Sequence, residues 1–72
     1  MANMLKLKAR IVEMNMNVES VAKEIGIDKS TFYRKMQNDG DDFTVSEVKK
    51  LSNVLNMDLD VLSNIFFESS VA

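Results

Sequence analysis

Apolar residues recur at helical spacing from the start of the chain. The first series has steps of three and four residues and consists of Met4, Leu7, Ile11 and Met14. Residues with these steps share one face of a helix. Asn15 follows, and asparagine tolerates the left-handed conformation in which helices often end. The pattern predicts a first helix that ends at about Asn15.

Two short helical segments follow. Asn17 is a good N-cap for a helix over residues 18–25, whose apolar residues Val21, Ala22 and Ile25 share one face. Gly26 is predicted to end this helix, since glycine adopts positive φ at little cost. Asp28 is a second N-cap residue, and the third helix is expected to run from about Lys29 to Met36.

Two more helices are predicted after a polar loop at residues 38–42. Thr44 and Glu47 have the T-x-x-E spacing of a capping box, which opens a fourth helix that Asn56 ends. Asp58 caps a fifth helix, and residues 68–72 are expected to fray. The apolar residues of the fifth helix are Val61, Leu62, Ile65 and Phe66. The sequence therefore predicts one compact all-α domain of five helices over residues 1–72.

Composition excludes several classes of protein. The 72 residues leave room for one domain only, and the absence of Pro with only two Gly disfavours an all-β fold. The absence of Cys and His removes disulfides, the usual zinc sites and the commonest general base, and it fits a reducing cytoplasm. No apolar run approaches the roughly 20 residues of a membrane helix. We expect no enzyme activity, no metal, no cofactor and no membrane association.

The acidic loop does not have the spacing of a calcium site. If Gly40 were the sixth residue of such a loop, its first ligand would be Lys35 and its twelfth Ser46. We interpret the loop as solvated.

Residues 18–37 have the features of a helix-turn-helix. Gly26 supplies the turn, and Ala22, four residues earlier, is small enough to let two helices cross closely. Val21, Ile25 and Phe32 are suited to a shared core. In such a unit the second helix can enter the major groove of DNA.

At these residues the chain resembles the lambda-repressor-like, or Cro-like, family of phage and bacterial regulators. The resemblance is carried by ESVAKEIGIDKSTF at residues 19–32, by LKARIVE at 7–13, by FTVSEVKKL at 43–51 and by IFF at 65–67. It covers about residues 5–67 and implies a five-helix DNA-binding fold. The chain departs from the family at Val18, where a phosphate-binding Gln is common, and at Met36, where an acid is common.

The charge is unevenly distributed along the chain. The net charge is −2, but residues 1–35 hold seven basic and four acidic residues, whereas residues 36–72 hold two basic and seven acidic residues. Basic charge therefore accompanies the predicted helix-turn-helix, and local field governs contact with phosphate. We expect weak non-specific binding with a strong salt dependence.

The resemblance implies that the first two turns of the third helix read base edges. The corresponding residues here are Lys29, Ser30 and Arg34, with Tyr33 beside them. Candidates for phosphate contact are Asn17, Lys35 and Asn38. Simpler interpretations remain open at this stage: the basic residues can form an ordinary solvated face, Asn17 can serve only as a helix cap, and Tyr33 can pack at the edge of the core.

These observations predict a Cro-like repressor of a phage or prophage-like element that acts by occupying an operator. The expected partner is double-stranded DNA with a palindromic operator, and no domain for sensing a small-molecule effector is expected. Phe66 and Phe67 cannot both face one core, so a weak homodimer is predicted through Leu62, Phe66 and Phe67. The alternative is a protein-interaction module that keeps the fold but has lost DNA binding, which the acidic balance and Val18 favour.

Overall fold

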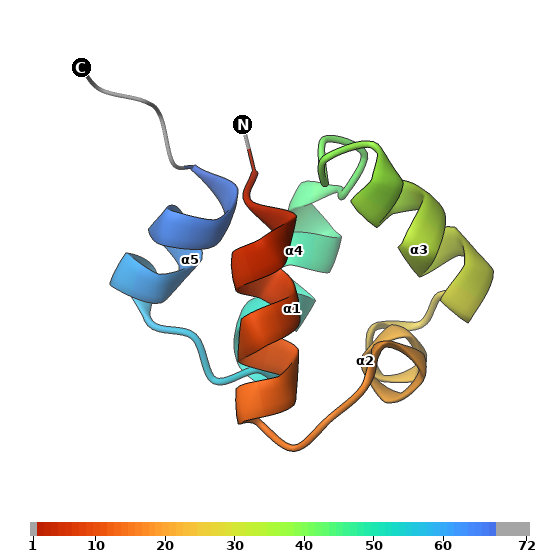
Figure 1. Cartoon of the computed structure of the whole chain (residues 1–72), viewed down its shortest axis with the longest axis horizontal. Helices are drawn as coiled ribbons and strands as arrows, with labels where there is room; N and C mark the ends of the chain where they lie inside the picture. The colour runs from red at the N-terminus through yellow and green to blue at the C-terminus, as the bar shows by residue number, and fades with distance from the viewer. Residues whose placement is uncertain (1, 68–72) are drawn as a thin grey trace.

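The structure is a computed structural model that describes residues 2–67, and five α-helices make up its regular structure. They are α1 (Met4–Glu13), α2 (Val18–Ile25), α3 (Lys29–Gln37), α4 (Val45–Val54) and α5 (Leu59–Phe66). Helix α1 lies in the middle of Figure 1, with α5 on one side and α2 and α3 on the other. The predicted all-α fold of five helices is confirmed, and the predicted frayed tail at residues 68–72 lies outside the described residues.

Side chains at the helix starts satisfy backbone N–H groups that have no partner within the helix. Asn17 Oδ1 accepts from the N–H of Ser20 at 2.8 Å, and Ser20 Oγ accepts from the N–H of Asn17 at 3.1 Å. Thr44 and Glu47 form the predicted capping box at the start of α4, with N···O distances of 3.1 and 2.9 Å. Asp58 accepts from the N–H of Val61 at 2.9 Å. The three predicted caps are confirmed.

Residues in the left-handed conformation separate the helices. Asn15 has φ 59°, Gly26 has φ 83° and Asn56 has φ 50°, as their positions after helical segments predicted. Asp28 occupies the N-cap position of α3, but its carboxylate makes no capping hydrogen bond. The prediction that the Asp28 side chain caps α3 is therefore wrong in this respect, and nothing in the structure explains it.

The core is built from one face of every helix. Three aromatic rings lie at its centre, with Phe32 edge-on to Phe43 at 5.2 Å and Phe43 edge-on to Phe66 at 5.9 Å between ring centroids. Phe66 is 8% exposed and Phe67 is 62% exposed, so the core accepts the first of these two neighbours. The other buried apolar residues are Leu7, Ile11, Val21, Ala22, Ile25, Met36, Leu51, Leu55, Met57 and Ile65.

Arg10 joins the two ends of the chain's core. Its Nε donates to the carbonyl oxygen of Leu55 at 2.9 Å, and its Nη2 donates to that of Asn56 at 2.7 Å. These acceptors belong to the end of α4, where backbone carbonyls lack helical partners. The contact fixes α1 against the turn that leads into α5. In residues 2–67 no helix has the length and apolarity needed to cross a bilayer.

Candidate nucleic-acid interface

Helices α2 and α3 form a tight two-helix unit around Gly26. The N–H of Gly26 donates to the carbonyl of Lys23 at 3.1 Å, and the N–H of Ile27 donates to that of Ala22 at 3.0 Å. These bonds satisfy the last carbonyls of α2, and the left-handed Gly26 redirects the chain into α3. Ala22 is fully buried, as a small side chain at a close helix crossing should be. The predicted helix-turn-helix geometry is present, and it holds α3 on α2 with one face outward.

The outward face of α3 carries all four residues that were predicted to meet base edges. Lys29, Ser30, Tyr33 and Arg34 are exposed, whereas Phe32 and Met36 point into the core. At 3.6 residues per turn the four exposed positions lie within an arc of about 140°. Within residues 2–67 the side chains of Lys29 and Arg34 form no ion pair or hydrogen bond. Their donors are therefore available to a ligand.

Tyr33 borders a shallow groove of about 340 Å³ between α3, α2 and the end of α1. Val12 and Val18 contribute apolar surface to this groove, and Asn17 and Lys8 contribute polar groups. Lys8 was not among the sequence-based candidates, although it is exposed and lies on the same groove as Tyr33. No periodicity in the sequence points to Lys8, since only the packing of α1 beside α3 brings it there.

Asn17 combines the two roles between which the sequence left a choice. Its Oδ1 accepts the capping hydrogen bond from Ser20, while its Nδ2 makes no hydrogen bond within residues 2–67. The Nδ2 group therefore remains a free donor at the N-terminal, positive end of the α2 dipole. That combination is suited to a phosphate oxygen.

Lys35 lies elsewhere than the DNA-facing surface. Its Nζ is 2.7 Å from Glu47 Oε1, donates to the carbonyl of Asp42 at 3.3 Å and lies 5.8 Å from the centroid of the Phe43 ring. Its side chain is 13% exposed. A phosphate contact by Lys35 would require this ion pair to break, so Lys35 has no part in the interface proposed below.

The other residues of this joint reinforce it. Burial by itself would raise the pKa of Glu47, but hydrogen bonds from Lys35 and from Thr44, with the charge of Lys35, hold the pKa below its ordinary value. Asn38 Nδ2 donates to Asp42 Oδ2 at 2.9 Å. The neighbouring carboxylate makes Asn38 a poor place for a phosphate, so the joint between α3 and α4 is structural.

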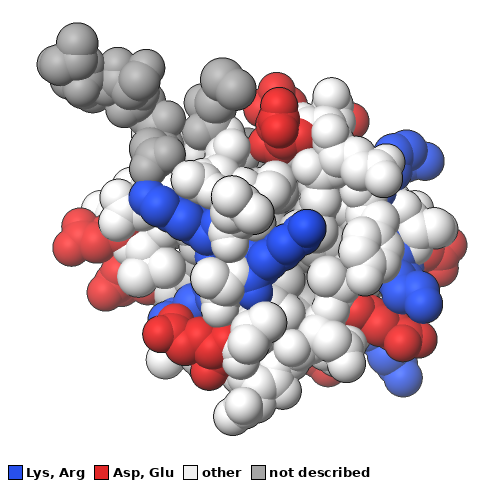
Figure 2. Space-filling model, viewed as in Figure 1, with Lys and Arg blue, Asp and Glu red and all other residues white. Residues whose placement is uncertain are grey.

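The surface around α3 is mixed in charge. Figure 2 shows basic side chains along its right-hand margin, over α2 and α3, with acidic side chains between them. The exposed acids of this region are Glu19, Glu24 and Asp28. Such a surface gives a weaker general attraction to phosphate than a uniformly basic one, so contacts to bases have to supply more of the affinity.

Comparison with known proteins identifies the fold and its general function. A family model described as the Cro/C1-type HTH DNA-binding domain matches residues 6–64, which include the whole of α2 and α3. No curated protein and no solved structure matches the chain. The family is one of DNA-binding domains and not of enzymes, which confirms the sequence-based resemblance and the prediction of a non-enzymatic chain. The chain belongs to the Cro/C1-type family of helix-turn-helix DNA-binding domains.

Proposed function

We propose that this DNA-binding domain is a sequence-specific transcriptional regulator, a Cro-like repressor that acts by occupying an operator. The observation that carries the proposal is the exposed face of α3, where Lys29, Ser30, Tyr33 and Arg34 are free of contacts with residues 2–67 through their charged groups. A helix fits the major groove, which is about 12 Å wide. A protein bound there excludes polymerase or a competing regulator.

The side chains on this face suit a site that contains guanine. Arg34 and Lys29 can donate to the O6 and N7 acceptors of guanine. Ser30 can donate or accept, and the ring of Tyr33 offers an apolar surface to a thymine methyl group. Asn17 and Lys8, at the edge of the same surface, are placed to hold the DNA backbone.

The proposal includes a phage or prophage-like role and a weak homodimer. The phage role rests on the resemblance to small phage repressors. The homodimer rests on two observations: few basic residues surround α3, and Phe67 is 62% exposed at the end of α5. Proteins of this type commonly read two half-sites, which calls for two recognition helices and a palindromic operator.

The test begins with selection of binding sites from a random DNA duplex library, followed by titration of the selected site. Lys29→Ala and Arg34→Ala are expected to weaken binding by about 1–3 kcal/mol each and to relax base preference at one position. Lys50→Ala removes an equally exposed cation from α4 and serves as the matched control. If both α3 variants bind the selected site as tightly as the parent, α3 is not the reading element.

The second candidate function is a protein-interaction module. The apolar groove at Val12 and Val18 beside α3, together with the acids Glu19, Glu24 and Asp28, favours it. The same selection decides between the two functions. Failure to enrich any sequence at low salt would favour the protein-interaction module, and an enriched site that depends on Arg34 would exclude it.

A further inference from the structure

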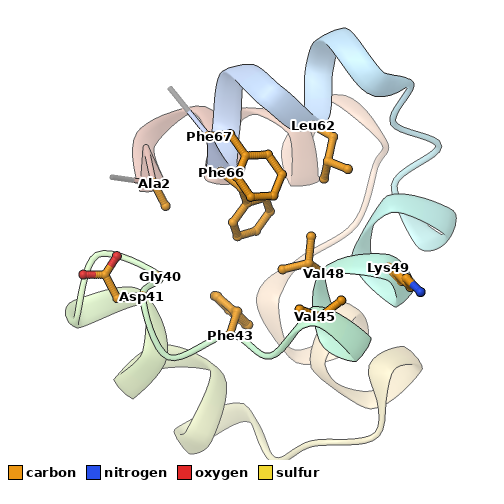
Figure 3. Close-up of a pocket in the computed structure, with 10 residues that line it drawn as sticks. All are labelled: Ala2, Gly40, Asp41, Phe43, Val45, Val48, Lys49, Leu62, Phe66 and Phe67. Carbon is orange, nitrogen blue, oxygen red and sulfur yellow. The ribbon is translucent and has the colours of Figure 1, made fainter. Parts of the chain in front are cut away.

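A second groove, away from the DNA-facing surface, is the largest apolar hollow described in the molecule. It has a volume of about 390 Å³ and lies between α4, α5, the N-terminal segment and the loop at residues 40–43 (Figure 3). Phe43, Val48, Leu62 and Phe66 give it an apolar lining. None of its lining residues belongs to α2 or α3, so an occupant of this groove would not compete with DNA for α3.

Phe67 stands at the rim of this groove. Its ring is 62% exposed, whereas the neighbouring Phe66 reaches the core. The N–H of Phe67 donates to the carbonyl of Ser63 at 2.9 Å, so the backbone that carries the ring is held on the end of α5. Val45, also on the rim, is 74% exposed. One face of the molecule therefore presents a hollow and, beside it, an apolar ring without a place in the core.

We propose that this groove receives Phe67 of a second copy of the chain, and that the exchange is reciprocal. A two-fold axis pairs a surface with itself, so each copy has to present both the projecting group and the hollow on one face. This face does so. The proposal deepens the proposed homodimeric regulator and rests on it, because it names the surface through which the two copies meet.

Two charged residues on the rim support a second copy as the occupant. Asp41 and Lys49 lie on opposite sides of the groove in Figure 3, and neither forms an ion pair within residues 2–67. A two-fold axis through the groove brings Lys49 toward Asp41 of the second copy, and it does so twice. Exposed ion pairs contribute little affinity, but they fix orientation and exclude mismatched partners.

The size of the groove agrees with a weak association. Its volume lies near the lower end of the roughly 300–1,000 Å³ of pockets that bind small molecules. A single aromatic ring and its neighbours therefore suffice to fill it. An apolar small molecule is the competing occupant, and it would leave the chain monomeric.

The first experiment is sedimentation equilibrium of the full chain without DNA. Phe67→Ser is expected to raise the dissociation constant of the dimer at least about tenfold, because each dimer loses two buried rings. Leu59→Ser is the matched control, since Leu59 is 75% exposed on α5 and does not line the groove. The thermal unfolding of both variants should match that of the parent, because neither side chain belongs to the core.

The second experiment exchanges the rim charges. Lys49→Glu alone and Asp41→Lys alone place like charges opposite each other, so each variant should dimerise more weakly than the parent. An equimolar mixture of the two should form a heterodimer as tight as the parent dimer, because both opposite-charge pairs are restored. Lys50→Glu, which changes an exposed α4 lysine outside the groove, should leave dimerisation unchanged.

The results also separate this proposal from the proposed function. A parent chain that stays monomeric at millimolar concentration, or a mixture that associates no better than either variant alone, overturns the reciprocal pairing. A dimer that fails to enrich DNA overturns the regulator and leaves the pairing in place. A monomer that still binds a single half-site through Arg34 does the reverse.

Discussion

Gly26 is the residue on which the turn between α2 and α3 depends. Its φ is 83°, and a Cβ placed on it would meet nothing within 4 Å, so any cost of substitution comes from the backbone alone. We expect Gly26→Val to lower the free energy of unfolding by more than about 1 kcal/mol, because a β-branched residue is strained at positive φ. Gly26→Asn should cost less, since asparagine tolerates this conformation. Denaturant titration measures both.

The outcome that contradicts this expectation is an equal unfolding midpoint for the Val variant and the parent. It would mean that the turn does not hold Gly26 at positive φ in solution. A loss of stability in the Val variant with unchanged denaturant dependence would show that only the turn is affected.

Single residues also show how far the sequence could predict the site. The adjacency of Phe66 and Phe67 indicated that one ring had to leave the core, but only the contact of Phe66 with Phe43 decides which one. Lys35 was expected to bind phosphate because it lies on α3. Its partner Glu47 is twelve residues away on α4, and no local pattern reveals that ion pair.

At the scale of the helices, the joint between α3 and α4 predicts a pH dependence of stability. The folded-state pKa of Glu47 is lowered, so the unfolded chain binds a proton more readily at this residue. The stability that the ionised carboxylate contributes is present above the pKa of the unfolded chain. It is lost as the pH falls through the lowered pKa of the folded state.

Glu47→Gln isolates this contribution. Glutamine keeps an oxygen that can accept from the N–H of Thr44, but it removes the charge opposite Lys35. We expect a loss of about 1–3 kcal/mol at neutral pH, because the nearly buried Lys35 ammonium loses its partner, and a smaller change of stability between neutral and acidic pH. Thermal unfolding at several pH values measures both effects.

Glu13→Gln is the matched control for the variant at the α3–α4 joint. Glu13 also lies 2.7 Å from a cation, Arg10, but its side chain is 65% exposed. Exposed ion pairs contribute at most about 1 kcal/mol, so this change should have little effect. Equal losses for Glu13→Gln and Glu47→Gln would contradict the importance assigned to the α3–α4 joint.

Helix boundaries were the most predictable part of the fold. Asn17, Thr44 and Asp58 mark helix starts because their short side chains accept from backbone N–H groups two or three residues later. The same rule placed Asp28 correctly but gave it a hydrogen bond that it does not make. Lys8 shows the limit of local rules, since its place beside Tyr33 depends on how α1 packs.

The whole molecule separates two surfaces with different partners. Helices α2 and α3 carry the DNA-facing side, while α4, α5 and the loop at residues 40–43 form the groove proposed for a second copy. The longest dimension of the domain is 36 Å. This is close to the roughly 34 Å that one turn of DNA spans, so two copies in contact match two half-sites one turn apart.

This geometry predicts a dependence on half-site spacing. Inserting five base pairs between the half-sites of a selected palindrome turns one of them by about half a turn, to the opposite face of the duplex. The paired copies then cannot hold both sites, and affinity should fall at least about tenfold, to that of a single half-site. Gel-shift titration of the original, expanded and single-site duplexes measures the loss. Phe67→Ser should bind the original and expanded duplexes equally, since its copies are not coupled. If the parent also binds both duplexes equally, the two copies act independently on DNA.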